Sequence, residues 1–545
     1  MPRKVLPLRG GFLAAILAVL LLGTAGVPQS LQPVSDYSAQ ISELLVDGRR
    51  LEVERRWGEA LSHYEDAVRQ FPDDRSIQLR FEHARMHYDL GRRYEDRSYQ
   101  RLLDGLSLAE ALDVYSEVLL KLEAHYVESP NWKELVEQGT NMLEVALSEP
   151  AFVDRHVPRA DVTVVNEFRY ELRRTLGPRV IQSRSEARNV VAWAAALAER
   201  RLGVEPHCIV LEYTCGATNS LDLYSTYLTP DQLTDVFSQI EGNFVGLGVE
   251  LKADGGALLI VRVIRGSPAE RSGIRAGDRI TTVDGQSTED LTTDQAANLL
   301  QGEVGTVAAL SVVSPGRDAR DVSVRRQRVE VPSIDDVRLV DAGLGIGYLQ
   351  LTCFQKTTCR DLDAALRNLH QQGMRSLIVD LRGNPGGLLV TAVEAADKFL
   401  EQGVVVSTRG RSVQEDFTYS AHQGGTWRVP LVVMIDHDSA SAAEIFAGAI
   451  GYHRRGTVVG TRSYGKGSVQ SIFHLNSTNG GLRLTTSKFY SPSGRPYGHV
   501  GVEPDVVVQQ TARPIDGSGE LTLTAGEDPM LAAAMQAAQQ LVAQR

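Results

Sequence analysis

Cysteine is scarce in this sequence, and long runs of basic residues are absent from it. Four cysteines in 545 residues cannot form a disulfide scaffold, and none lies in a C-x-x-C pair that would indicate structural zinc. Lys and Arg number 57 and Asp and Glu 68, so the formal net charge is -11 and nucleic acid is not an expected partner. No H-E-x-x-H motif is present, and we expect chemistry without a metal or another cofactor.

The composition is otherwise that of a globular protein. Hydrophobic residues make up 43% and charged residues 23%, which argues against wholesale disorder, a collagen-like chain or a membrane protein with many spans. At roughly 150 residues per domain, the length predicts three or four domains.

Residues 1–28 have the pattern of a secretory signal. Basic residues precede an apolar stretch over 12–22, and small residues lead from it to Pro28. The stretch is about eleven residues long, short of the roughly twenty that span a bilayer, and no clean cleavage site follows it. We expect an exported protein, periplasmic or secreted; cleavage of the segment and its retention as a membrane anchor both stay open. Export permits disulfides, with free thiols as the alternative. The local pairs are Cys208 with Cys215 and Cys353 with Cys359.

The N-terminal part of the chain has the periodicity of helices. Residues 36–106 form a helical region in which residues 41–74 resemble one tetratricopeptide unit. In such a unit small residues let two helices approach and a proline ends the second, although an ordinary helical hairpin is the alternative. The matching residues are Gly48, Ala60, Tyr64, Ala67 and Pro72. One repeat cannot bury its own face, so we expect it to pack on a degenerate neighbour or on the rest of the protein. The region is also a candidate surface for a protein partner. Residues 107–240 stay helical in pattern, with a break at 150–158 and an insertion at about 152–210.

Residues 241–328 form a self-contained unit in which strands replace helices. Strands are expected at 258–263 and 307–313, a short helix from Ser267, and a second helix over 293–300. The run S-P-A-x-x-S-G-I-x-x-G-D-x-I resembles a PDZ domain. In such domains the N–H groups of a glycine-containing loop bind the C-terminal carboxylate of a peptide, which adds a strand to the sheet edge. The matching residues are Gly246, Leu247, Gly248 and Val249; a β domain without a ligand is the alternative.

Strands and helices alternate over residues 329–525, which predicts an α/β layer with a largely parallel sheet. Strands are expected at 344–351, 376–381, 403–408 and 431–435, and helices at 359–372, 388–400 and 441–451. A C-terminal helix is expected within 526–545. Ligand chemistry should then lie at the carboxyl ends of the strands.

Three motifs in this region can carry chemistry. The glycine-rich loop 380–387 can aim backbone N–H groups at an anion. The Ser-Ala-Ser run at 439–441 meets the start of a helix, where negative charge is stabilised, although these serines and Glu444 can also simply cap the helix. The turn at 465–467 places Lys466 between two glycines. A lone lysine of this kind is usually a solvated turn residue.

Together, and in this order, these motifs resemble the C-terminal processing peptidases, also called tail-specific proteases, over about residues 112–545. The resemblance implies a crotonase- or ClpP-like α/β catalytic core with an inserted PDZ domain and an all-α N-terminal region. It assigns the nucleophile to Ser441, the general base to Lys466 and the lysine-orienting role to Gln470. The oxyanion hole is assigned to the backbone of Gly387 and Ala442, with Gly386 a close second. A segment at 220–225 replaces the family's Asp-Pro-His.

The chemistry of the residues supports these roles. A serine hydroxyl needs a neighbouring base, and lysine can act as one only when burial lowers its pKa far enough to leave the amine neutral. Gln470 can accept a hydrogen bond from the amine without adding the negative charge that would raise this pKa. A Ser-His-Asp triad is the competitor, but no G-x-S-x-G elbow surrounds Ser441. The histidines concerned are His437, His453, His474 and His499.

The sequence therefore predicts an exported serine endopeptidase that binds polypeptides with free C-terminal tails and cleaves them through an acyl-enzyme. A non-catalytic PDZ and helical-repeat scaffold on a degenerate protease fold is the alternative. A scaffold would have no use for Ser441, Lys466 and Gln470 together.

Overall fold

The structure is a computed structural model that describes residues 34–157, 161–254, 257–289, 299–422, 424, 426–508 and 528–543. The chain forms two compact units, one up to Tyr88 and one from Asp89 onwards. The predicted signal segment and most of the predicted helix at 293–300 lie outside the described residues. Within the described part of the chain, no helix is both long and apolar enough to cross a membrane.

The first unit contains a helical hairpin of α1 (Val34–Val53) and α2 (Trp57–Gln70). The two helices pack closely because Gly48 lies against the ring of Tyr64, where a Cβ would collide with ring atoms. Ala60, Tyr64 and Ala67 are buried in α2, as the spacing predicts. A hairpin fits the tetratricopeptide interpretation and its alternative equally well. Helix α3 (Arg75–Glu95) leads into the second unit.

Helices open the second unit. They are α4 (Arg97–Gly105), α5 (Leu108–His125), α6 (Trp132–Ala146), α7 (Pro150–His156), α8 (Val162–Leu176), α9 (Arg184–Leu202) and α10 (Pro206–Asn219). Helix α10 is buried almost throughout and packs on α5, α6 and α9. Gly216 of α10 touches the backbone of α6, since a Cβ there would lie 2.7 Å from Gly139 Cα.

Two findings bear on the expectations for this region. Pro150 begins α7 at its first turn, where a missing N–H costs nothing, so a short helix occupies most of the break expected at 150–158. All four thiols are free, and Cys208 and Cys215 lie two turns apart on one helix, so of the two possibilities left open it is the free thiols that hold. The insertion at about 152–210 stays a prediction.

The next part of the chain folds as a small antiparallel sheet with the strand order β3-β4-β5-β7-β8, and β6 pairs with β5. The strands are β3 (Val249–Asp254), β4 (Ala257–Val263), β5 (Arg279–Val283), β6 (Gln286–Ser287), β7 (Val307–Val313) and β8 (Ala319–Arg325). A short helix, α12 (Pro268–Arg271), follows β4 as predicted. A separate pair of strands, β2 (Asn243–Gly246) and β9 (Gln327–Glu330), frames this sheet in the sequence. Strand β3 lies at the sheet edge, with β4 on one side of it.

The α/β core contains a sheet of six strands in the order β10-β11-β12-β15-β16-β19. They are β10 (Ile334–Asp341), β11 (Ile346–Leu351), β12 (Ser376–Asp380), β15 (Leu431–Ile435), β16 (Thr457–Gly460) and β19 (Val506–Val507). The five strands from β11 to β19 are parallel, as predicted, and β10 is antiparallel to β11. Strands β12 and β15 are buried at every residue.

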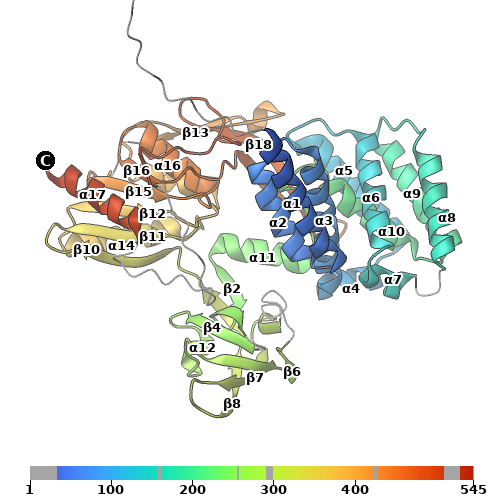
Figure 1. The fold of residues 1–545 in the computed structure, drawn as a ribbon, viewed down its shortest axis with the longest axis horizontal. Helices are drawn as coiled ribbons and strands as arrows, with labels where there is room; N and C mark the ends of the chain where they lie inside the picture. The colour runs from blue at the N-terminus through green and yellow to red at the C-terminus, as the bar shows by residue number, and fades with distance from the viewer. Residues whose placement is uncertain are drawn as a thin grey trace, which may run out of the picture. The chain divides into compact units, whose positions relative to one another are not determined.

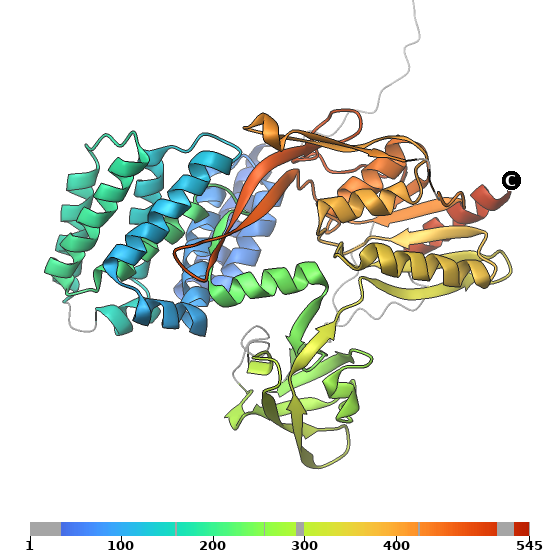
Figure 2. The same cartoon turned by 180° about the vertical axis from the view of Figure 1, so that it is seen from behind.

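Helices cover both faces of this sheet. Leu377 and Val379 of β12 pack in the same cluster as α14 (Thr358–Gln371), α15 (Leu389–Asp397) and α16 (Ala442–Tyr452). Ile378, between them, packs in the opposite cluster with α17 (Pro529–Ala543). Figure 1 shows α17 on one face of the sheet, and Figure 2 shows the helices of the other face. The likeness to crotonase or ClpP sheets stays a prediction.

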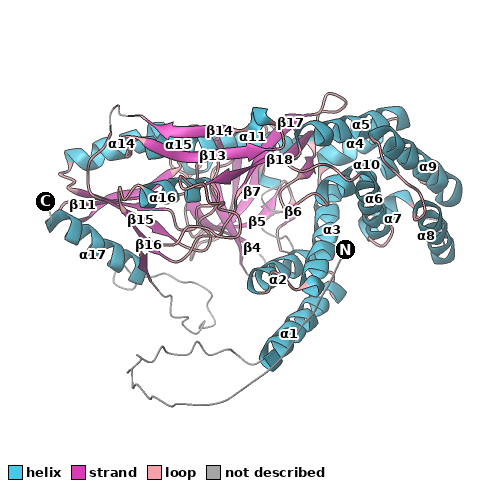
Figure 3. Ribbon diagram, turned by 90° about the horizontal axis from the view of Figure 1, so that it is seen from above, coloured by secondary structure: helices cyan, strands magenta, loops and turns pink. Residues whose placement is uncertain are grey.

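The strand expected at 403–408 does not belong to the parallel layer. As β13 (Gly403–Gly410), it lies in a second, antiparallel sheet with the order β1-β18-β13-β14, and β17 pairs with β18 (Figure 3). The other members are β1 (Thr226–Leu228), β14 (Phe417–Ala421), β17 (Ser468–His474) and β18 (Gly481–Tyr490). Buried and exposed residues mix along β13, as in a strand covered on one face, and its short apolar run hid this difference in the sequence.

Candidate active site

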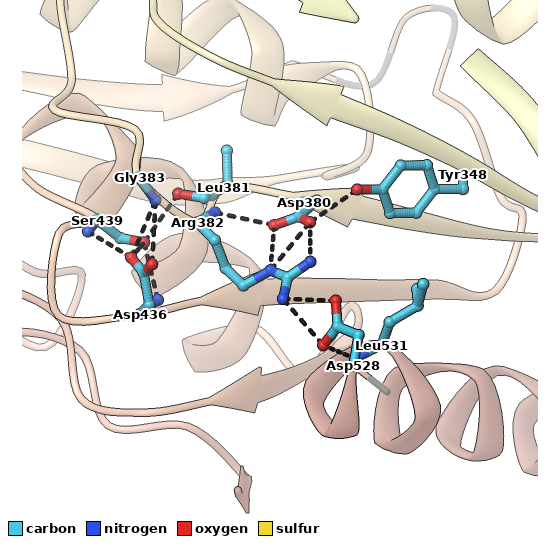
Figure 4. Close-up of polar contacts among 9 residues, drawn as sticks. All are labelled: Tyr348, Asp380, Leu381, Arg382, Gly383, Asp436, Ser439, Asp528 and Leu531. Atoms are coloured by element: carbon cyan, nitrogen blue, oxygen red, sulfur yellow. Dashed lines mark hydrogen bonds and ion pairs between the residues drawn. The ribbon is translucent and has the colours of Figure 1, made fainter. Parts of the chain in front are cut away.

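Two loops leave the sheet at the carboxyl ends of β12 and β15 and are joined by hydrogen bonds (Figure 4). The carboxylate of Asp436 accepts the N–H groups of Gly383 and Ser439, each at 3.0 Å. The Ser439 hydroxyl donates to the carbonyl of Leu381 at 2.8 Å. The first serine of the Ser-Ala-Ser run is therefore a buried structural link between the loops.

The base of the glycine-rich loop is fixed by an ionic cluster that the sequence did not reveal. Asp380, 1% exposed, accepts the hydroxyl of Tyr348 at 2.8 Å and the guanidinium of Arg382 at 2.7 Å. Arg382 also pairs with Asp528 at 2.8 Å, at the start of α17 (Figure 4). Donors on two sides satisfy the buried carboxylate, so the loop leaves β12 in one defined direction.

Ser441 lies at the N-cap of α16 in a backbone conformation that side-chain-bearing residues rarely adopt, with φ 55° and ψ -113°. Such strain persists only where the surroundings enforce it, and it is frequent at functional sites. Gly386 packs directly against this turn, since a Cβ at that position would lie 2.7 Å from Ser441 Cβ. The glycine-rich loop and the serine are thus in contact. Part of the capping expectation also holds, because Ser441 N–H donates to Glu444 Oε2 at 2.7 Å.

The backbone hydrogen bonds of the glycine-rich loop distinguish between the candidate oxyanion donors. Gly386 N–H already donates to Asn384 Oδ1 at 2.8 Å, so it is a poor choice for a substrate oxyanion. The N–H groups of Gly387 and Ala442 donate to no other residue in the described part of the chain. Gly387 has φ 138° and packs on the backbone of Phe354, where no side chain fits. The geometry favours Gly387 and Ala442.

Lys466 precedes β17, and its amine lies 4.4 Å from the centre of the Tyr224 ring. Burial, together with the positive charge of Arg483, lowers the pKa of this amine to about 8. The negative charges of Glu444 and Asp222 oppose this shift. A substantial fraction of Lys466 is therefore neutral near pH 8, as a lysine base requires. Tyr224 comes from the 220–225 segment, whose position beside the lysine the sequence did not reveal.

Gln470 lies on β17, and its amide nitrogen donates to Ser468 Oγ at 3.0 Å and to Thr485 Oγ1 at 3.3 Å. Among the described residues, no hydrogen bond joins it to the Lys466 amine. Its role in orienting the lysine stays a prediction.

The candidate histidines have other partners. His453 Nε2 lies 2.7 Å from the carbonyl of Val404, and His474 stacks on Phe237 with ring centres 5.0 Å apart. His437 is exposed beside Asp438, and His499 is exposed. None of these four described histidines has a hydrogen bond to Ser441. The geometry therefore gives no support to a Ser-His-Asp triad.

The predicted carboxylate-binding loop connects β2 to the edge strand β3. The carbonyl of Leu247 accepts the N–H of Ala269 and the carbonyl of Gly248 accepts the N–H of Ile264, both at 2.9 Å. Gly248 has φ 85° and packs against Ser267, where a Cβ would collide. The loop is thus held through its carbonyls. Its contacts with a peptide stay a prediction.

Comparison with known proteins connects these features. Residues 345–508 match peptidase family S41, and residues 259–314 match the PDZ domain. A carboxy-terminal-processing protease of Bartonella bacilliformis is 38% identical over 301 residues, which cover 54% of this chain and 68% of that protein. A carboxyl-terminal-processing protease of Synechocystis sp. is 33% identical over 307 residues, 55% of this chain and 70% of that protein. The chain belongs to the carboxy-terminal-processing proteases of family S41.

The S41 match includes the glycine-rich loop, the Ser-Ala-Ser run and the lysine turn. A probable CtpA-like serine protease of Staphylococcus aureus is 31% identical over 289 residues, 53% of this chain and 57% of that protein. The chain is thus a serine-type peptidase of family S41 with a PDZ domain and a helical N-terminal region.

Proposed function

We propose that this S41 peptidase is an exported endopeptidase that cleaves peptide bonds with Ser441 as nucleophile and Lys466 as general base. The single observation that carries the proposal is the lysine itself. Its amine is buried enough that its pKa falls to about 8, and its backbone N–H shares one carboxylate oxygen with the backbone N–H of Ser441.

In the proposed reaction, neutral Lys466 takes the proton of the Ser441 hydroxyl while the serine oxygen bonds to the scissile carbonyl carbon. The N–H groups of Gly387 and Ala442 would hold the negative oxygen of the tetrahedral intermediate. The C–N bond then breaks, and the leaving amine takes the proton from the Lys466 ammonium. Water then attacks the acyl carbon while Lys466 takes its proton. The bond between that carbon and the Ser441 oxygen breaks, and the serine oxygen takes the proton back from the Lys466 ammonium. Gln470 would orient the amine in each step.

We further propose that polypeptide substrates with free C-terminal tails bind to the PDZ domain. A tail would add a strand to the edge of β3, and its carboxylate would meet the N–H groups of the 246–249 loop. An edge strand and a loop held through its carbonyls support this proposal. The proposal also includes export of the protein, with residues 12–22 as a possible membrane anchor, and binding of a protein partner to residues 36–106.

The test compares hydrolysis of an unstructured peptide, and labelling by a serine-reactive probe, in the wild type, Ser441→Ala and Lys466→Ala. Matched controls are Ser493→Ala and Lys488→Ala, which remove an exposed serine and an exposed lysine. Wild-type activity and labelling that both variants lose and both controls keep would support the dyad. Absence of labelling and turnover in the wild type would favour the scaffold.

A further inference from the structure

Glu444, in the first turn of α16, is a buried carboxylate whose partners extend well beyond a helix cap. It is 1% exposed. Its Oε2 accepts the backbone N–H of Ser441 at 2.7 Å and that of Lys466 at 2.9 Å. Its Oε1 accepts the hydroxyl of Ser463 at 2.6 Å and the N–H of Gly465 at 2.7 Å. Three of the four donors come from the segment that carries the lysine.

This arrangement makes chemical sense for an ionised carboxylate. Its two oxygens offer about four lone-pair sites, and four donors occupy them. The pKa of Glu444 is raised by burial, and the four hydrogen bonds, which favour the ionised form, oppose this shift. A buried carboxylate without these donors would be strongly destabilising, so the donors and the carboxylate hold one another in place.

The shared oxygen also limits how far apart the two chain segments can be. The backbone nitrogens of Ser441 and Lys466 are hydrogen-bonded to the same oxygen, so the distance between them cannot exceed the sum of their two distances to that oxygen. The backbone of Ser441 and that of Lys466 are therefore hydrogen-bonded to one atom, although the two residues are 25 positions apart in the sequence.

We propose that Glu444 is a positioning residue, whose carboxylate holds the lysine turn against the N-cap of the nucleophile. The inference rests on the proposed Ser441–Lys466 dyad. Position comes with an electrostatic cost, because the charge of Glu444 favours the protonated amine. The charged groups that act on this amine are Glu444 from α16, Asp222 from the segment before β1 and Arg483 from β18, and the Tyr224 ring faces it.

The substitution Glu444→Gln should have two separate effects, one from the lost positioning of the lysine turn and one from the lost negative charge, and the two can be measured separately. The amide group cannot accept four donors, so the lysine turn should loosen and kcat should fall about 10- to 100-fold with little change in KM. Loss of the negative charge should lower the pKa of Lys466, so the rise of kcat/KM with pH should move to lower pH. A glutamate that only stabilised the fold would leave the midpoint unchanged.

The matched control is Glu110→Gln, because Glu110 forms the same capping box with Ser107 at the exposed start of α5, without a lysine turn. It should leave the profile and kcat unchanged. Glu444→Asp, which keeps the charge but shortens the side chain, should reduce kcat without the acid shift. Equal profiles for the wild type and Glu444→Gln would overturn the inference.

Two measurements decide the inference without relying on catalysis. In a Ser441→Ala background, trace acylation of Lys466 across pH should show its midpoint moving to lower pH when Glu444 becomes Gln. Hydrogen exchange of a peptide covering 463–468 should become faster. If the wild type neither cleaves peptides nor labels with the serine probe, the proposed function fails, yet these readouts still test Glu444.

Ser463→Ala provides a second variant in case Glu444→Gln does not fold. It removes one donor and keeps the charge, so exchange over 463–468 should rise while the acylation midpoint does not move to lower pH. Unchanged exchange in that variant would overturn the positioning role.

Discussion

Two helices of this protein begin with the same four-residue pattern, and they differ in almost everything else. Ser107 to Glu110 opens α5, and Ser441 to Glu444 opens α16, each with the glutamate folded back onto the N-cap amide. The α5 box is exposed and its serine is extended, with φ -81°. The α16 box is buried, its serine has φ 55°, and its glutamate also holds the lysine turn. A local pattern thus predicts a cap, and the tertiary surroundings determine whether the cap belongs to a site.

The largest expected effect separates the two serines. Ser441→Ala should reduce turnover on the order of 10⁴-fold or more while the protein stays folded, because it removes the proposed nucleophile. Ser107→Ala should leave turnover unchanged and cost about 1 kcal/mol of stability, as loss of an N-cap does. Peptide hydrolysis and urea unfolding of both variants measure this difference. Similar turnover in the two variants would remove Ser441 from the mechanism.

Lys466→Ala should be as severe as Ser441→Ala, and the double variant should be no worse than either. The two groups act in one step, so once either is removed that step is already lost and removal of the other causes no further loss of turnover. Single-turnover rates of the three variants on one peptide provide the measurement, with Lys488→Ala as the matched control. Additive losses would show that the two residues contribute to different steps.

The next effect concerns pH. Protonated lysine cannot take the serine proton, so kcat/KM should rise with pH through the lysine pKa, about 8. Gln470→Glu should raise this pKa, because a nearby carboxylate favours the charged amine, and should move the profile to higher pH. The measurement is a pH–rate profile of the wild type and Gln470→Glu, with folding checked at each pH. Gln414→Glu, at an exposed position, is the control.

A rise centred near the ordinary histidine value of about 6.5 that ignores Gln470→Glu would contradict the lysine mechanism. It would reopen the case for a histidine base despite the separate partners that the structure gives those residues.

Much of the fold was predictable because the spacing of apolar residues in the sequence matches the pattern of buried residues in the structure. The apolar runs at 376–381 and 431–435 are fully buried central strands, and such strands are the pattern of a parallel sheet covered on both faces. The run at 403–408 looked the same but belongs to an antiparallel sheet, since six residues are too few to show which face is exposed. The short helix α7 occupies most of the break expected at 150–158, because a proline can begin a helix as well as end one.

The site was predictable only in its short-range motifs. Ser441, Lys466 and the glycine-rich loop each lie in a recognisable run of the sequence. The tie between Arg382 and Asp528 joins residues 146 positions apart, and no local pattern encodes such a contact. The second role of Glu444 was hidden for a different reason. Its capping function was a sufficient explanation of its position until the donors of the lysine turn were placed around it.

A smaller effect tests recruitment by the PDZ domain. Amidating the C-terminus of a peptide should weaken binding by about tenfold or more, because it removes the charge that the 246–249 N–H groups would receive. Titration calorimetry with Ser441→Ala protein and matched free and amidated peptides measures this effect without cleavage. Equal affinities would show that the domain does not recognise tails, and the PDZ domain could then only control access to the site.

The smallest effect on turnover concerns the other serine of the Ser-Ala-Ser run. Ser439 is fully buried, and its hydroxyl donates to Leu381 and accepts the N–H of Asp436 at 2.9 Å. Ser439→Ala should therefore cost about 1–3 kcal/mol of stability by leaving buried groups unpaired. Turnover should stay within about tenfold of the wild type, because two hydrogen bonds that do not involve the Ser439 hydroxyl still join the loops: Gly383 N–H donates to Asp436, and Ala440 N–H donates to the carbonyl of Asn384. Urea unfolding and kcat, measured for Ser439→Ala and for Ser441→Ala, distinguish the structural serine from the proposed nucleophile. A loss of turnover equal to that of Ser441→Ala, in a protein that unfolds like the wild type, would mean that Ser439 acts in the chemistry and that its links to the loop are incidental.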